Sequence, residues 1–548
     1  MKKLINGSKF ITVFAILLLI VSGCSQGAAS NNSDQQSDGQ NTAKAEPGGE
    51  LTYALSTSPD SLDPHVSSRA VAVRAFRTMF DSLVVQDADN SIQPWLATKW
   101  TISDDGKSYT FELREDVTFH DGTPFNAEAV KYNFDRILNP ETKAANSTGL
   151  LAPYESAEVL NEYTVKLNLE TPSASFLSNL SQAMLGIVSP TAAEKYGDQF
   201  GKNPVGTGPF KFVSWTENAD IQVEKNEKYN WGPTNLENKS EPYIDILTFK
   251  IIPEEATRIG SVQSGQVLAA ETIPPQNIVA LENDPETQLL KANTLGLPYT
   301  LFFNQRREPW NDVNVRKAIM LAVDVDAIVK TLYLGTYDRA WSPLTPGILG
   351  YDESLEDSWD LDLDMANRLL DEAGYKKGSG GIREKDGKKL TLNYVDDSPN
   401  REKRNDIAII VQQQLKEVGV EVEINVTPDY MNVIYENSDY DLYGNSQVNS
   451  DPDSLRRIYH TPERDGGFAS LVGGYDSRLD ELLEQGTVEL DPAKREEIYK
   501  EAQQIVIDQA MIIPIYVFPY TVAASKKVNG IKFDTLGYPL FNDVSIEQ

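Results

Sequence analysis

Residues 97–127 read ATKWTISDDGKSYTFELREDVTFHDGTPFNA, and this stretch contains the clearest structural pattern of the chain. Apolar and polar side chains alternate after Ser108, which predicts a strand within 108–119. Asn126 then stands where a helix N-cap is expected, because the apolar residues after it recur at helical spacing. These residues are Val130, Phe134, Ile137 and Leu138. A strand that leads into a capped helix favours a fold that mixes both kinds of element.

The alternation of helices and strands continues in the second half of the chain. The expected elements are a helix capped by Asp364 and ended by Gly374, a helix over 407–418 closed by Gly419, a strand over 421–426, a helix opened by Asp491-Pro492, and a buried strand over 511–517. No fixed-period repeat is present. The pattern predicts an α/β fold.

The N-terminus has the layout of an export signal. Lys2, Lys3 and Lys9 form a basic start, and residues 10–21 are almost wholly apolar. This run is too short to span a bilayer, which needs about 20 apolar residues, but it fits the h-region of a signal peptide. We therefore expect residues 1–23 to be a signal peptide.

Cys24 follows this signal directly and is the only cysteine of the sequence. Val21-Ser22-Gly23-Cys24 resembles the bacterial lipobox, in which the cysteine receives a diacylglycerol and becomes the mature N-terminus. We expect a lipidated Cys24, and a flexible tether over 24–49 because this segment is small and polar. The anchor would hold the protein on the extracytoplasmic face of the cell membrane. A single cysteine allows no internal disulfide, so a large core must stabilise the fold.

Charge and length narrow the possible partners. The chain has 50 basic and 81 acidic residues, and this net charge of −31 opposes binding to nucleic acid or to anionic lipid headgroups. Its 548 residues exceed what one core usually organises, so two or three lobes are expected.

Three kinds of cluster suggest catalysis, and each has a simpler structural interpretation. The glycine-rich segment 206–211, GTGPFK, lacks the Ser or Thr that follows the lysine of a phosphate loop, and its proline removes a backbone amide, so it is interpreted as a turn. The acidic pairs in 104–106 and 451–453 stand beside Gly or Pro, as in turns. The histidines, His65, His120 and His460, have no metal-binding spacing. The sequence predicts neither an enzyme nor a bound metal or cofactor.

Several motifs together resemble one family. They are Ser61-Leu62-Asp63-Pro64, the segment from Ala97 to Ala127 with its SDDGK and FHDG motifs, the PVGTGPF motif of 204–210, Pro242-Tyr243, Phe303-Asn304, Val315-Arg316-Lys317-Ala318, the LDEAGY motif of 370–375, and Asp451-Pro452. The chain closely resembles family 5 solute-binding proteins of ABC importers, which include oligopeptide, dipeptide and nickel-chelate receptors. The resemblance covers nearly all of residues 50–530.

The resemblance implies a type II periplasmic-binding-protein fold, in which two hinged lobes close on a ligand and a third domain is inserted in the first lobe. By that similarity the first lobe holds 50–83, 206–300 and 518–548. The inserted domain is 84–205, and the second lobe is 301–517. Because the chain crosses between the lobes more than once, few residues need to change conformation for closure.

The resemblance also implies where a ligand binds. In peptide-binding relatives a carboxylate stands at the position of Val448, and in nickel-chelate relatives an arginine stands at that of Ala183, so the chain departs from both patterns. Asn449, Asp451, Asp396 or Asp397 are alternative partners of a ligand amine, and Arg69 of a ligand carboxylate. The full set of expected ligand-binding residues is Ser67, Ser68, Arg69, Asn304, Trp341, Asp396, Asp397, Val448, Asn449 and Asp451.

The function implied is the substrate-binding component of an ABC importer, which captures a peptide or peptide-like solute and delivers it to permease and ATPase subunits. An alternative is a receptor for a metal chelate such as a metallophore complex. A surface adhesion or signalling lipoprotein and a hydrolase are the other hypotheses, and no catalytic motif supports the last.

Overall fold

The computed structural model describes residues 47–398, 400–461, 473 and 476–547. The predicted signal peptide, Cys24 and the tether up to residue 46 lie outside the described residues, so those predictions remain predictions. Within the described ranges no helix is long and apolar enough to cross a membrane.

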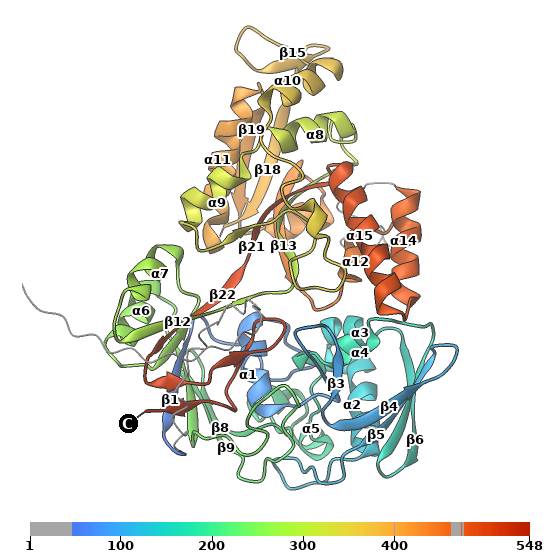
Figure 1. Ribbon diagram of the computed structural model, residues 1–548, viewed down its shortest axis with the longest axis vertical. Helices are drawn as coiled ribbons and strands as arrows, with labels where there is room; N and C mark the ends of the chain where they lie inside the picture. Colours follow the sequence, from blue (N-terminus) through green and yellow to red (C-terminus); the bar gives the residue numbers. More distant parts are fainter. Residues whose placement is uncertain (1–46, 399, 462–472, 474–475, 548) are drawn as a thin grey trace, which may run out of the picture. The chain divides into compact units, whose positions relative to one another are not determined.

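Two large mixed sheets organise the described part of the chain (Figure 1). The seven-stranded sheet has the order β12 (Thr287–Asn293), β22 (Pro519–Ser525), β11 (Ala269–Glu271), β1 (Glu50–Leu55), β10 (Ile246–Ile251), β9 (Asp220–Lys225) and β8 (Phe210–Thr216). The six-stranded sheet has the order β14 (Asp338–Arg339), β21 (Ile512–Val517), β13 (Gly296–Phe303), β20 (Leu442–Val448), β18 (Thr391–Asp397) and β19 (Glu421–Thr427). The predicted strands over 421–426 and 511–517 are confirmed.

A third, antiparallel sheet contains the segment that dominates the sequence. Its order is β4 (Ala97–Ile102), β5 (Ser108–Leu113), β7 (Thr164–Leu169) and β6 (Tyr154–Asn161). The predicted strand is confirmed as β5, with Tyr109, Phe111 and Leu113 buried, but it ends before residue 119 because turns fill the interval up to Asn126. Asn126 caps the next helix as predicted, since its side chain accepts a hydrogen bond from the Ala129 amide.

Short strands form the remaining pairs. They are β2 (Val84–Gln86) with β3 (Ile92–Pro94), β15 (Lys376–Lys377) and β17 (Lys388–Lys389) around β16 (Arg383–Lys385), β23 (Val528–Asn529) with β26 (Ser545–Ile546), and β24 (Lys532–Phe533) with β25 (Pro539–Leu540).

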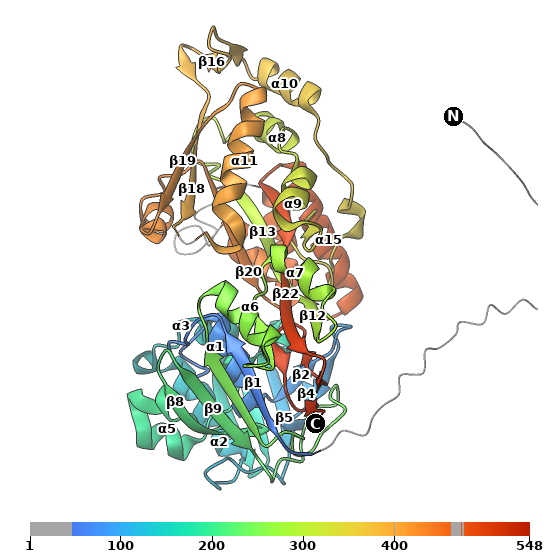
Figure 2. The same cartoon turned by 90° about the vertical axis from the view of Figure 1, so that its left-hand side faces the viewer.

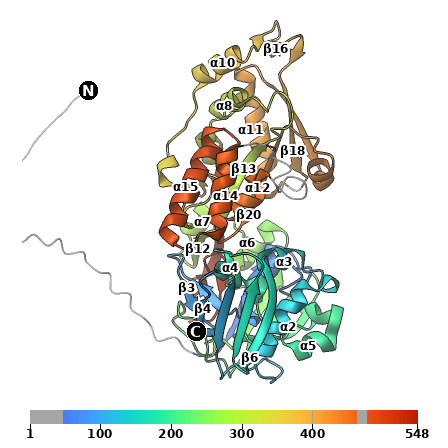
Figure 3. The same ribbon diagram turned by 90° about the vertical axis from the view of Figure 1, so that its right-hand side faces the viewer.

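Helices cover the sheets. In the first part of the chain they are α1 (Ala70–Met79), α2 (Ala127–Leu138), α3 (Ala145–Leu151), α4 (Phe176–Leu180), α5 (Pro190–Tyr196), α6 (Glu255–Gln263) and α7 (Pro275–Glu282). In the second part they are α8 (Val313–Leu321), α9 (Val325–Tyr333), α10 (Leu363–Glu372), α11 (Arg404–Glu417), α12 (Ser454–Tyr459), α14 (Ser477–Val488) and α15 (Pro492–Asp508). Figure 2 shows α9 and α11 beside the six-stranded sheet, and Figure 3 shows α14 packed along α15.

The predicted helix ends are confirmed at most positions. Gly374 and Gly419 follow α10 and α11 with φ of +89° and +84°, the left-handed conformation that glycine adopts most readily. The N-cap of α10 was predicted wrongly: it is Asp362, whose carboxylate accepts a hydrogen bond from the Met365 amide at 2.8 Å. Asp364 lies within the first helical turn, where an acid still complements the helix dipole.

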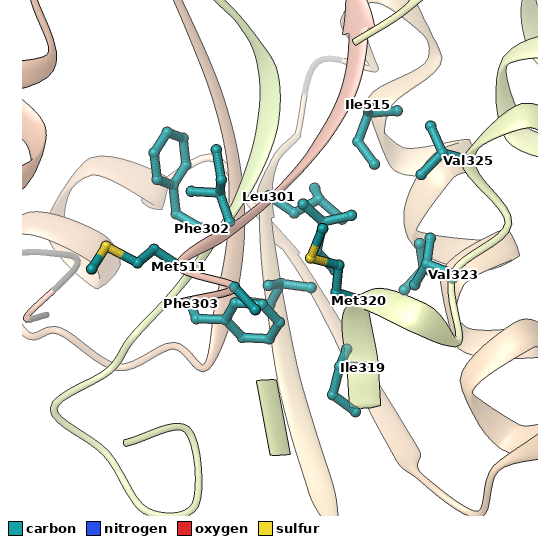
Figure 4. Packing of buried hydrophobic residues seen from close by; sticks show 14 of the residues in the cluster. Leu301, Phe302, Phe303, Ile319, Met320, Val323, Val325, Met511 and Ile515 are labelled. Carbon is teal, nitrogen blue, oxygen red and sulfur yellow. The ribbon is translucent and has the colours of Figure 1, made fainter. Parts of the chain in front are cut away.

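Separate hydrophobic cores fill the molecule. The largest lies under the six-stranded sheet and is built from residues between 297 and 516, where β13 packs on α8 (Figure 4). A second core lies under the seven-stranded sheet, and a third packs against the four-stranded sheet. The prediction of a large core is confirmed, because each sheet buries an apolar face.

The glycine-rich segment 206–211 is a structural turn, as predicted. His120 fixes it, because its backbone amide donates to the Gly206 carbonyl at 2.9 Å and its Nε2 lies 2.9 Å from the Gly208 carbonyl oxygen. A side chain at Gly208 would place its Cβ 2.5 Å from the Met79 carbonyl carbon, so only glycine fits there. The two most recognisable motifs of the sequence therefore pack against each other and stabilise the fold.

Candidate ligand-binding site

The two large sheets present their carboxyl edges at the places where the chain passes between them. β12 leads into β13 through residues 294–295, and β21 leads into β22 through Phe518 (Figure 1). β18, β19 and β20 run parallel, and β20 ends at Val448 opposite the first residue of β13. β1, β10 and β11 are likewise parallel, and β11 ends opposite Val522 in the middle of β22. In sheets with parallel strands, ligands bind beyond such carboxyl ends.

Three of the expected ligand-binding residues end strands of the six-stranded sheet. Asp396 and Asp397 end β18, and Val448 ends β20. Asp396 is buried, and burial raises the pKa of its carboxyl group. Its Oδ1 accepts a hydrogen bond from the Asp397 amide, whereas its Oδ2 has no hydrogen-bond partner among the described residues. Val448 is 41% exposed, so an apolar surface stands where the resemblance to peptide receptors implies a carboxylate.

Asn449 and Asp451 follow β20, and both form hydrogen bonds that stabilise the fold. The Asn449 amide donates to the Leu295 carbonyl at the chain crossing, and its side-chain oxygen accepts a hydrogen bond from the Asp451 amide. Arg495 binds both carboxylate oxygens of Asp451, at 2.8 and 2.6 Å, and Ser178 donates to the same group. Although burial opposes ionisation, Arg495 holds the pKa of Asp451 below its usual value. Both oxygens of the Asp451 carboxylate are therefore bonded within the protein, so this group is not available as the counter-ion of a ligand amine.

On the seven-stranded sheet, the loop between β1 and α1 carries the other expected polar group. Arg69 is the N-cap residue of α1, and its exposed side chain lies 3.7 Å from Asp60. Ser67 is buried and donates to Asp60 at 2.6 Å, while Ser68 is exposed. Because the loop follows the carboxyl end of β1, Arg69 lies at the edge where a ligand is expected.

Two of the expected ligand-binding residues, Asn304 and Trp341, do not belong to the group at the carboxyl edges. Asn304 follows the far end of β13, and its amide donates to the Ser438 and Tyr440 carbonyls, so it closes a loop at the opposite edge of the sheet. Trp341 packs against the Arg339 guanidinium, 3.4 Å from its ring, and against Trp359. Asn304 was chosen from the Phe303-Asn304 motif, and the side chains of both Asn304 and Trp341 are engaged with these structural partners.

Sequence reasoning missed Arg404, which is buried beside the carboxyl end of β18. It pairs with Glu402 at 2.6 Å, lies over the Tyr299 ring and donates to Ser446 of β20. Glu402 and its neighbour Lys403 both have positive φ, at 49° and 58°, a conformation unusual for these residues. The signal available in the sequence was the charged run 401–406, directly before the predicted helix over 407–418.

Exposed apolar residues gather at the same edges. Val426 and Val448 end or nearly end their strands, Met431 follows β19, and Val66 lies in the loop before α1. Their exposed fractions are 41%, 41%, 60% and 39%. Large exposed apolar side chains beside charged ones are typical of a site that takes an amphipathic ligand. No group of three or more potential metal ligands occurs among the described residues.

This architecture, two sheets joined by two strand crossings, defines the class of two-lobed extracytoplasmic binding proteins. The model for bacterial extracellular solute-binding proteins, family 5, matches residues 91–466, and the chain belongs to this family. The predicted family and fold class are confirmed.

Individual relatives differ in their ligands. The glutathione-binding protein GsiB of Escherichia coli O1:K1 / APEC is 27% identical over 499 residues, which cover 88% of this chain and 91% of GsiB. NikA from Brucella suis, solved with Fe(III)-EDTA, has a TM-score of 0.81 at 27% identity, covering 91% of this chain and all of that one. The periplasmic binding protein DppA from Helicobacter pylori, solved with the peptide STSA, has a TM-score of 0.76 at 26% identity, covering 92% and 99%. GsiB and DppA are described as binding proteins.

Proposed function

We propose that this protein is the substrate-binding component of an ABC importer and that it captures a peptide or peptide-like solute between its lobes. The observation that carries the proposal is the pairing of charged and exposed apolar residues at the two carboxyl edges, with Arg69 on one and Asp396 and Val448 on the other. A peptide offers both kinds of group. The DppA relative supports this ligand class, since it is described as associated with an ABC transporter and holds a peptide.

The lobes proposed are those inferred from the sequence, with 50–83, 206–300 and 518–548 in the first, 84–205 inserted, and 301–517 in the second. The separate cores support the outline of this division, because the largest draws on residues between 297 and 516, although Leu297 and Tyr299 pack into it from the segment assigned to the first lobe. Residues such as Ala183, Val188 and Phe200 pack into the core of the seven-stranded sheet, so the inserted domain is joined firmly to the first lobe.

A metal chelate is the second candidate ligand. NikA holds Fe(III)-EDTA, whose carboxylates would suit an exposed cation such as Arg69. In this chain Ala183 stands where the nickel-chelate pattern has an arginine, so a chelate would have to be held differently.

The proposal includes the membrane anchor and excludes catalysis. A diacylglycerol on Cys24 would keep the body near the permease and ATPase subunits on the extracytoplasmic face, with residues 25–49 as the tether. Binding proteins among the relatives, and the absence of a catalytic motif in the sequence, support a receptor that leaves its ligand unchanged.

The test is to identify what the purified protein carries and then to measure closure. The bound solute is released by denaturation and identified by mass spectrometry, and a melting screen of short peptides and chelates follows. A ligand at a hundredfold excess over its Kd should stabilise the folded protein by about 2.7 kcal/mol. X-ray scattering should show a smaller radius of gyration with the ligand. Tight binding without compaction would contradict the clamp.

A further inference from the structure

A cavity of about 380 Å³ lies where residues of the 84–205 segment meet α15 and the loop that follows the carboxyl end of β20. Its lining includes Ser178 and Asp451, whose hydrogen bond of 3.1 Å joins the two parts, and Ala174, whose amide donates to the Thr487 carbonyl. Its volume falls within the range of small-molecule sites. None of Arg69, Asp396 and Val448 is among the lining residues.

Two buried polar atoms in the lining lack partners. Gln86 is 5% exposed and Ser450 is 1% exposed, and neither Gln86 Oε1 nor Ser450 Oγ has a hydrogen-bond partner among the described residues. The Gln86 amide nitrogen donates to Asn90 at 3.2 Å, which fixes Oε1 as a free acceptor. Buried polar groups are normally satisfied, so these atoms indicate a site that accepts something polar.

The walls of the cavity are apolar, and its charge is negative. Leu177 and Leu349 line it, and Ile102 and Leu490, which are 39% and 45% exposed, complete an apolar surface. The lining contains four carboxylates, Asp89, Asp451, Glu489 and Glu496, against the single guanidinium of Arg495. The Arg495 guanidinium donates hydrogen bonds to the Asp451 carboxylate and to the Gly486 carbonyl. The site therefore offers hydrogen-bond acceptors and negative potential, and no free cation among its described lining residues.

We propose that this cavity binds a small organic cation, a primary ammonium on an apolar body, with the ammonium beside the Glu496 carboxylate and the body against the leucines. A rotation of the Gln86 side chain towards the cavity would let its Oε1 accept a hydrogen bond from the ammonium. Such a group belongs either to a free amine or to the amino-terminal residue of a peptide. Occupancy would bridge the inserted domain and the second lobe, because the walls come from both. The inference does not depend on the solute bound at the carboxyl edges.

The experiment titrates the full-length protein with 2-phenylethylamine, its N-acetyl derivative and 3-phenylpropionate, followed by calorimetry and ligand-observed NMR. We expect a Kd of about 1 mM for the amine and binding about tenfold weaker for the two other probes. Glu496→Gln should weaken amine binding by about threefold, as for a partly exposed ion pair. Glu497→Gln is the matched control, since Glu497 is adjacent, exposed and not part of the lining. Gln86→Met should weaken binding by about tenfold or more.

Three outcomes overturn the proposal: no binding of the amine, equal binding of the amine and its acetyl derivative, or equal weakening by Glu496→Gln and Glu497→Gln. Weakening by Asp396→Asn but not by Glu496→Gln would place the ammonium at the carboxyl edge and also overturn it. A free-amine tripeptide beginning with Phe separates the two sources. Tighter binding of this peptide than of phenylethylamine, with the same sensitivity to Glu496→Gln, assigns the ammonium to a peptide terminus, and the reverse order assigns it to a free amine.

Discussion

Tyr516 and Tyr520 lie on either side of the chain crossing at Phe518, and each donates a hydrogen bond to a glutamate: Glu402, half-buried in the turn after β18, and Glu271, buried at the end of β11. The Tyr516 hydroxyl lies 3.0 Å from Glu402 Oε2, and the Tyr520 hydroxyl lies 2.7 Å from Glu271 Oε2. Both carboxylates are paired with arginine: Glu402 with Arg404 at 2.6 Å and Glu271 with Arg74 at 2.9 Å. This crossing is thus held on both sides by the same arrangement, which confines rotation within it to residues 517–519, while the other crossing passes through residues 294–295.

Removal of the Tyr520 hydroxyl tests this anchoring. Hydrogen bonds to charged groups contribute about 1.5–3 kcal/mol, so Tyr520→Phe should lower the free energy of unfolding by that amount in urea titrations. Tyr337→Phe is the control, because Tyr337 packs in the aromatic cluster around Tyr516 and its hydroxyl has no hydrogen bond among the described residues. Equal effects of the two substitutions would show that the Glu271 contact adds nothing.

A second prediction concerns acid stability. His120 is half-buried, and desolvation of its ring lowers its pKa to about 4. Its Nδ1 accepts a hydrogen bond from the Gly206 amide and its Nε2 faces the Gly208 carbonyl, as suits the neutral ring. The folded state then binds fewer protons than the unfolded chain between the ordinary pKa of 6.5 and about 4. The stability contributed by the neutral ring is complete above pH 6.5 and is lost as the pH falls towards 4, by up to about 3 kcal/mol.

His120→Gln isolates this contribution, because glutamine can still donate to Gly208 and does not titrate. The variant should be less stable than wild type at pH 7 and should lose less stability between pH 6.5 and 4.5 in melting experiments. Asp81 works in the opposite direction, since burial raises its pKa to about 6 and its protonation favours the folded state as the pH falls. That contribution is common to both proteins and cancels in the difference. Parallel pH profiles would contradict the prediction.

A third prediction concerns Cys24. Replacement of Cys24 by Ala should abolish diacylglycerol attachment and release the protein from the membrane, since stable anchoring requires more than one acyl chain. Incorporation of labelled palmitate and membrane fractionation measure the effect. Ser25→Ala is the matched control and should remain anchored. A Cys24→Ala protein that still incorporates palmitate would show that the lipobox interpretation is wrong.

The sequence predicted the fold better than the site, for physical reasons. Periodicity and caps are local, so β5, α2 and the glycine ends of α10 and α11 could be found directly. Asp362 was missed because two aspartates stand two residues apart and only the backbone decides which one caps. The family motifs predicted the architecture because they are packing motifs, as the contact of His120 with Gly208 demonstrates.

The role of a site residue depends on its contacts with segments that are distant in the sequence. A single sequence does not reveal such contacts. Arg495, which is 44 residues away, binds both carboxylate oxygens of Asp451, and no local pattern of the sequence indicates this contact. Asn304 matched a motif but lies at the wrong edge of the sheet, and Arg404 matched none although it lies beside β18. Topology, which places Asp396 and Val448 at one edge, carries most of the functional information.

The last prediction concerns Val448. With Asp451 occupied by Arg495, the described residues at the end of β20 offer a ligand amine no free carboxylate, so free-amine dipeptides should bind weakly to the wild type. Val448→Asp places a carboxylate there, and the 41% exposure of this position lets the fold tolerate it. The variant should bind a free-amine dipeptide about tenfold or more tightly than wild type, from a charged hydrogen bond of about 1.5–3 kcal/mol. Its affinity for the native solute should fall, because the apolar contact is lost.

Calorimetric titration with the dipeptide and its acetylated twin measures both effects. The control for added charge is Val213→Asp, because Val213 is 45% exposed on the edge strand β8. Submicromolar binding of the free dipeptide by wild type, lost on acetylation, would contradict the prediction and assign the amine to Asp396 and Asp397.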